Sequence, residues 1–127
     1  MVAVKPRKWA RFTLEAGYKL PGPSYVRPDV SITHAAQPHG KYLNDAPAIA
    51  IEVISPSNTA EEMEKKVELY FRYGTRQVWR VYRDAVHIVV HLPDRTSRTV
   101  LEGSLATPLL SGFELRLADL EASIEKP

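Results

Sequence analysis

Residues 48–54 form an apolar run that is interrupted by a single carboxylate, Glu52. A short apolar run of this kind, bounded by a loop rich in proline, serine and asparagine, predicts a buried β-strand. A charged side chain inside such a strand is unfavourable unless it is paired or holds a metal ion. The fold must therefore bring a partner or a ligand to Glu52.

The segment after this strand has the features of a helix start. Asn58 and Thr59 are both good N-cap residues, and Glu61 and Glu62 follow in the first turn, where carboxylates favour the positive end of the helix dipole. Gly74 is a typical residue just beyond a helix end. The sequence predicts a helix over residues 59–73.

Two adjacent lysines of this helix have different predicted environments. The apolar stripe consists of Met63, Val67, Tyr70 and Phe71. At about 100° per residue, Lys66 falls at the border of the stripe, whereas Lys65 points to solvent with Glu68 and Arg72. Along the preceding strand, side chains alternate, so Glu52 shares its face with Ala50 and Ile54, opposite Ile49, Ile51 and Val53. Lys66 is the candidate partner of Glu52.

Alternating apolar residues predict the other elements. We expect a strand over residues 12–20, a second over 30–33 after Pro28, and a loop over 34–47. An antiparallel hairpin over residues 77–82 and 85–92, turning at Arg83-Asp84, precedes a weaker strand over 98–101.

His87 and His91 share one face of this hairpin, which the pattern assigns to solvent or to a dimer partner, and Trp79 is assigned to the core. The order of elements indicates an α/β or α+β fold with a mixed sheet and a helix after the strand that carries Glu52.

Composition limits the functional classes. The chain has 127 residues and 44% hydrophobic content, which predicts a single domain over residues 1–127 with an N-terminal arm over 1–11. No apolar run reaches the roughly 20 residues of a membrane span, so we expect a cytoplasmic protein without a membrane partner. With no cysteine, a metal ion would be held by oxygen or imidazole. The net charge of +2 permits DNA binding without favouring it, and Lys5, Arg7, Lys8 and Arg11 around Trp9 fit either a phosphate contact or a solvated arm.

Asp29 provides a second carboxylate at the start of the strand that follows Pro28. Two carboxylates and a lysine can hydrolyse a phosphodiester, because the acids hold a divalent ion that activates water and the ammonium stabilises the attacking oxygen. Each residue also has a simpler interpretation: Asp29 caps a turn, and Glu52 and Lys66 form a buried ion pair. The combination favours catalysis.

The same residues resemble a known family. The segments Arg27-Pro28-Asp29-Val30 and residues 51–59, followed by Lys66, Tyr70, Gly74 and Val78-Trp79, are similar to the Uma-type family of bacterial endonucleases. That family belongs to the PD-(D/E)XK restriction-endonuclease-like superfamily. The resemblance continues through residues 110–115 and covers about residues 12–120.

This resemblance implies a nuclease centre. It assigns Asp29 and Glu52 as metal-binding acids, the backbone carbonyl of Val53 as a further ligand, and Lys66 as the catalytic lysine, with Mg²⁺ or Mn²⁺ as the cofactor and no organic cofactor. The usual lysine of the superfamily lies two residues after the second acid, a position that here is Ile54. Ser57, Asn58 and Tyr70 are possible accessory residues of the site, and Glu15 is a candidate third carboxylate.

Family members usually have a longer region before the Pro-Asp strand, whereas 28 residues precede Asp29 in this sequence. Two functions follow: a metal-dependent DNA endonuclease, or a catalytically inactive nuclease-fold module that binds DNA or a protein partner. Cleavage of two strands suggests a homodimer by analogy, because symmetric DNA suits a two-fold axis.

Overall fold

A computed structural model of the chain describes residues 12–14, 16–21, 25–34, 43–83, 85–107 and 114–119. In these ranges the long helix, α1, spans Ala60–Arg72. The strands are β1 (Phe12–Leu14), β2 (Tyr18–Lys19), β3 (Tyr25–Val26), β4 (Val30–Ile32), β5 (Leu43–Asn44), β6 (Ile49–Ile54), β7 (Gln77–Tyr82), β8 (His87–His91), β9 (Ser97–Val100), β10 (Ser104–Ala106) and β11 (Glu114–Arg116). No helix of the described ranges is long and apolar enough to cross a membrane.

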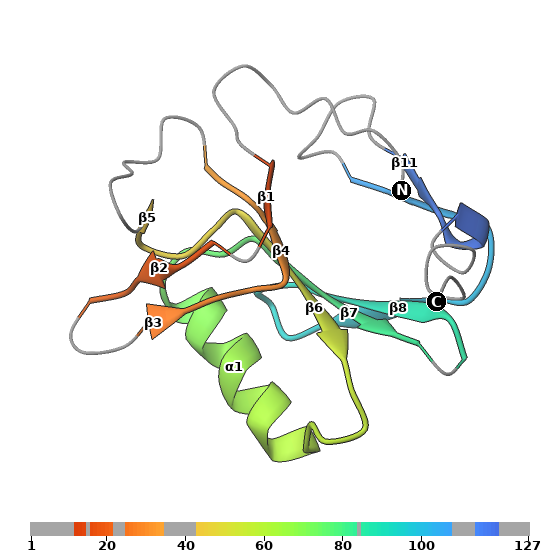
Figure 1. The fold of residues 1–127 in the computed structure, drawn as a ribbon, viewed down its shortest axis with the longest axis horizontal. Coiled ribbons are helices and arrows are strands. Elements are labelled where there is room, and N and C mark those ends of the chain that lie inside the picture. Colours follow the sequence, from red (N-terminus) through yellow and green to blue (C-terminus); the bar gives the residue numbers. More distant parts are fainter. Residues whose placement is uncertain are drawn as a thin grey trace.

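The central element is a six-stranded mixed sheet with the order β1-β4-β6-β7-β8-β9 (Figure 1). β6 and β7 are parallel neighbours, and α1 connects them. The other neighbouring pairs of this sheet are antiparallel. The predicted mixed sheet, with a helix after the strand that carries Glu52, is therefore confirmed.

Each face of the sheet buries its own apolar cluster. The cluster on the helix side includes Ala50 and Val78 from the sheet and Tyr70 from α1, together with Tyr18 and Val26 from the small sheet β3-β2-β5. The cluster on the other side is built from ten residues, listed here: Ile32, Ile49, Ile51, Trp79, Val81, Ile88, Val90, Val100, Leu105 and Leu117. The alternation of side chains along β6 thus sends Ala50 and Glu52 toward α1 and Ile49 and Ile51 away from it.

The long elements lie close to their predicted positions. β6 and α1 match the prediction within one residue at each end. Trp79 is fully buried, as expected. Val53 differs, because it is 38% exposed at the end of β6, beyond the apolar cluster that covers Ile49 and Ile51. The second strand of the hairpin begins at His87 rather than Ala85, and Asp84 lies outside the described residues.

The short elements differ from the prediction. The strand expected over residues 12–20 is two strands in different sheets: β1 pairs with β4, and β2 pairs with β3 and β5. The loop expected over 34–47 contains β5, and the sequence analysis missed β3, β10 and β11. Strands of two or three residues are too short to show a period, so alternation reveals neither their ends nor a change of sheet.

Candidate active site

Glu52 is the buried centre of a polar cluster between β6 and α1. It is only 4% exposed. Its Oε2 atom lies 2.8 Å from the Lys66 Nζ atom and accepts a hydrogen bond of 3.3 Å from the Tyr70 hydroxyl. Its Oε1 atom accepts a hydrogen bond of 3.3 Å from the backbone N–H of Asp29. The expected pairing of Glu52 with Lys66 is present.

Lys66 and Lys65 differ as the helical wheel predicts. Lys65 forms an exposed ion pair with Glu61, one turn earlier, at 3.4 Å. The side chain of Lys66 is 40% exposed, whereas the Glu52 side chain to which its ammonium is paired is only 5% exposed. The ion pair therefore joins a buried carboxylate to a partly exposed lysine.

Asp29 lies beside Glu52 because β4 and β6 are antiparallel neighbours, with Val30 opposite Ile51. The Asp29 Oδ2 atom accepts a hydrogen bond of 2.7 Å from the backbone N–H of Val53. Two hydrogen bonds thus join the two strands at the acidic residues. The Asp29 backbone N–H donates to the Glu52 carboxylate, and the Val53 backbone N–H donates to the Asp29 carboxylate. This reciprocal bonding fixes the spacing of Asp29 and Glu52.

Tyr70 keeps its proton in this environment. Burial raises the pKa of the Tyr70 hydroxyl far above its ordinary value, and the neighbouring Glu52 carboxylate raises it further. The raised pKa keeps the hydroxyl protonated at neutral pH, so it can donate its hydrogen bond to one oxygen of Glu52. Its role here is to orient the carboxylate.

The charges of the cluster favour a cation. Asp29 and Glu52 carry two negative charges, and within the described ranges Lys66 is the one side chain that forms an ion pair with either of them. The pair of carboxylates and the lysine thus have a net charge of −1. Carboxylate oxygens together with a backbone carbonyl are the donors that hard divalent cations prefer. The donor set of the cluster fits such an ion, although the part of the chain that the structure describes brings no group of three or more acidic or histidine residues together.

The accessory residues have separate positions. Asn58 accepts hydrogen bonds from the backbone N–H of Ser55, at 2.8 Å, and from its hydroxyl, at 3.1 Å, and the Ser55 hydroxyl lies 2.9 Å from that of Ser57. Ser57 and Asn58 thus shape the turn between β6 and α1, and Thr59 caps the helix instead of Asn58. Glu15 and the basic cluster of residues 5–11 lie outside the described residues.

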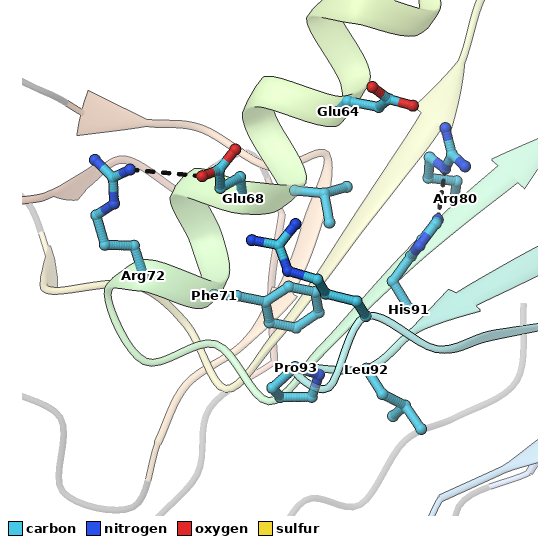
Figure 2. Close-up of a pocket in the computed structure, with 10 residues that line it drawn as sticks. Glu64, Glu68, Phe71, Arg72, Arg80, His91, Leu92 and Pro93 are labelled. Carbon is cyan, nitrogen blue, oxygen red and sulfur yellow. Dashed lines mark hydrogen bonds and ion pairs between the residues drawn. The ribbon is translucent and has the colours of Figure 1, made fainter.

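A pocket of about 620 Å³ lies between α1 and the β7–β8 side of the sheet (Figure 2). Arg80 pairs in register with Glu52 and extends toward α1, where its Nε–H donates a hydrogen bond of 2.8 Å to the Nε2 atom of His91. Burial lowers the pKa of His91, and the Arg80 guanidinium lowers it further. We expected His87 and His91 to face solvent or a dimer partner; both residues are half-buried, and His91 lines this pocket beside α1.

Comparison with known proteins extends these observations. A family model, Uma2, with the description "Putative restriction endonuclease", matches residues 2–118. The chain belongs to the Uma2 family. The Uma2 chain is also similar to a crystal structure of a putative nuclease belonging to DUF820 from Anabaena variabilis, with a TM-score of 0.81 and 22% sequence identity. The match covers 94% of this chain and 72% of that chain, and it shows a shared fold. No curated protein matches the sequence.

The sequence analysis did not identify Arg80 as a neighbour of Glu52. A signal was present, because Arg80 interrupts the apolar run Val78-Trp79-Arg80-Val81 just as Glu52 interrupts its own strand. The parallel register of β6 and β7, which places Glu52 and Arg80 opposite each other, is a tertiary feature and cannot be read from either strand alone.

Proposed function

We propose that this Uma2 protein is a divalent-metal-dependent DNA endonuclease in which Asp29 and Glu52 hold the metal ion and Lys66 is the catalytic lysine. The observation that supports this proposal is the pair of reciprocally bonded carboxylates with Lys66 at 2.8 Å from Glu52. The family description supports DNA as the substrate. Mg²⁺ or Mn²⁺ is the ion that the donor set suits.

Each residue has a distinct role in this proposal. Asp29, Glu52 and the backbone carbonyl of Val53 would hold the ion, which when bound would lower the pKa of water and neutralise charge on the phosphate. Lys66 would orient the scissile phosphate and stabilise the charge that develops on its oxygens. Tyr70 keeps Glu52 in place with a hydrogen bond from a hydroxyl that stays protonated. Ser57 and Asn58 shape the turn beside the site.

The proposal includes a homodimer, because two antiparallel DNA strands present the scissile phosphates with two-fold symmetry, and two identical sites match that symmetry. Each protomer would then cut one strand. A dimer of this kind converts supercoiled plasmid to linear DNA with little nicked intermediate, whereas independent single sites accumulate the nicked form.

The test is cleavage of supercoiled plasmid by the purified protein in Mg²⁺, in Mn²⁺ and in EDTA. The chain offers matched controls: Glu61→Gln for Glu52→Gln, and Lys65→Met for Lys66→Met, since Glu61 and Lys65 form an exposed ion pair on the same helix as Lys66. We expect Glu52→Gln and Lys66→Met to lower the cleavage rate at least about a hundredfold, the usual effect of removing one charge-stabilising group. Both control variants should retain wild-type rates within about twofold.

Equal cleavage by the wild type and Glu52→Gln would identify a contaminating nuclease and contradict the proposal. Absence of cleavage from the wild type in both metals, with DNA binding retained in a gel-shift assay, would instead support the nuclease-fold module without catalytic activity.

A further inference from the structure

A second pocket, of about 510 Å³, adjoins the end of the strand that carries Glu52. One wall comes from the turn after β6, with Ser55 and Asn58, and the other comes from the end of β7 and the start of β8, with Tyr82, Arg83 and His87. Its volume lies in the range of pockets that bind small organic ligands. The pocket is mixed in character, with aromatic rings, hydroxyl and amide groups, and one cation.

The aromatic wall is a preformed stack. Tyr82 and His87 are cross-strand partners in the β7–β8 hairpin, and their rings are parallel within 2° with centroids 4.5 Å apart. The Nδ1 atom of His87 contacts the backbone carbonyl of Ala85, and the Arg80 guanidinium lies 5.9 Å from the centroid of the Tyr82 ring. These contacts hold both rings in place, although both side chains remain partly exposed.

The cation of the pocket is available for an anionic ligand. Arg83 is exposed, and it forms no ion pair with any residue that the structure describes. An aromatic stack beside an exposed arginine is the combination that proteins use to hold a nucleotide, because the rings stack on the base and the guanidinium binds the phosphate.

The pocket is close to the candidate active site. Ile54, which lines the pocket, is two residues after Glu52 and on the same face of β6, so the two sites are separated by about 7 Å along the strand. Consecutive nucleotides of a DNA strand have a rise of about 3.4 Å, and more when the strand is unstacked. The pocket therefore lies one or two nucleotides from a phosphate held at Asp29 and Glu52.

We propose that this pocket binds one unstacked nucleotide beside the scissile phosphate, with its base against the Tyr82–His87 stack and its phosphate at Arg83. This inference rests on the proposed nuclease function and specifies its substrate class. A base cannot stack on protein rings while it is stacked inside a duplex. The preferred substrate is accordingly DNA with an unpaired nucleotide or a single-stranded segment next to the cleavage site, rather than a continuous duplex.

The test is binding of oligonucleotides that contain the fluorescent base 2-aminopurine. All binding is measured with Glu52→Gln protein, so that the DNA is not cleaved during the measurement. One oligonucleotide duplex places 2-aminopurine opposite an abasic position, so that this base has no pairing partner, and its control places 2-aminopurine opposite thymine in a continuous duplex. We expect at least about tenfold tighter binding of the unpaired substrate, with quenched 2-aminopurine fluorescence in the complex. Adding His87→Ala should abolish the quenching and weaken binding of the unpaired substrate about tenfold, which is the typical effect of losing one base–aromatic stack.

Two further variants separate stacking from folding. His87→Phe keeps a ring at this position and should restore the quenching, whereas Arg83→Ala should weaken binding without restoring fluorescence. Arg98→Ala, an exposed arginine on β9, is the matched control and should leave both properties unchanged. Melting temperatures of all variants identify any that fail to fold.

The readout is binding, so it is independent of catalysis. Equal affinity for the two substrates, or quenching that persists in His87→Ala, would overturn the pocket assignment even if the wild type cleaves plasmid. Quenching that depends on His87 would support the assignment even if no metal ion gave cleavage, and in that case the nuclease function alone would be contradicted.

Discussion

Glu52 has more partners than a structural ion pair requires. Replacing a buried ion pair with apolar residues of similar volume is often neutral or stabilising, so stability alone is a weak reason to bury this carboxylate. Asp29 is bound into the same cluster, because its backbone N–H donates to the Glu52 carboxylate and its own carboxylate accepts the backbone N–H of Val53. We expect this arrangement to serve the proposed metal site, in which Asp29 and Glu52 act together.

The Tyr70 hydroxyl tests this view at the level of one atom. Tyr70→Phe removes a buried donor to Glu52 and keeps the ring that packs in the helix-side cluster. Because a hydrogen bond to a charged group contributes about 1.5–3 kcal/mol, we expect the free energy of unfolding to fall by about that amount at pH 7, as measured by urea denaturation. Cleavage should also slow, since Glu52 loses one of its constraints. Tyr73→Phe, a half-buried tyrosine beyond the helix end, is the control; an equal loss in both variants would contradict a specific role for Tyr70.

At the scale of elements, the sequence predicts those that are long or that carry chemically distinctive residues. β6 is identified by its continuous apolar run, and α1 by its cap, its acidic first turn and Gly74, which adopts a positive φ of 106° just beyond the helix. The distinction between Lys65 and Lys66 follows from helix geometry alone. The strands of the two small sheets have no such signals, because two or three residues pair only where tertiary contacts bring them together.

The cap of α1 has a measurable consequence for the helix that carries Lys66 and Tyr70. The Thr59 side chain accepts a hydrogen bond of 3.1 Å from the backbone N–H of Glu62. Thr59→Ala leaves that N–H without its partner, and we expect the free energy of unfolding to decrease by about 1 kcal/mol in chemical denaturation. Thr59→Ser retains the hydroxyl and should stay within a few tenths of a kcal/mol of the wild type. A large loss in Thr59→Ser as well would indicate that the methyl group, rather than the cap, is responsible.

At the scale of the whole molecule, the candidate site depends on three segments that are distant in sequence. Asp29 comes from the start of β4, Glu52 from β6 and Lys66 from α1, and the order β4-β6-β7 with α1 across it brings them together. The sequence analysis identified Glu52 because a carboxylate is unusual in an apolar strand, Lys66 because of its place on the helical wheel, and all three residues through the resemblance to a known family. It did not identify the Arg80–His91 pair or the Tyr82–His87 stack, because these contacts depend on the register of β7 against β6 and β8.

Two half-buried histidines make the stability of the fold depend on pH. Burial is the main cause that lowers the pKa of His34 and of His91 below the ordinary value of 6.5. Arg76 lowers the pKa of His34 further, while the Gly74 backbone and Asp45 partly oppose the shift, and Arg80 adds to the shift of His91. Below pH 6.5 the unfolded chain therefore binds more protons than the folded chain.

The stabilisation from these histidines is complete above pH 6.5 and is lost as the pH falls below it. We expect the free energy of unfolding to decrease between pH 7 and pH 5.5, by at most about 1.4 kcal/mol per histidine for each pH unit. Urea denaturation at these pH values measures the slope, and His91→Gln, which keeps an acceptor for Arg80, should make it shallower. An unchanged slope in His91→Gln would show that His91 is not the titrating group. A steeper slope would mean that folding raises rather than lowers the pKa of His91, which the contact with Arg80 opposes because a protonated imidazole has no free acceptor for the Arg80 N–H group.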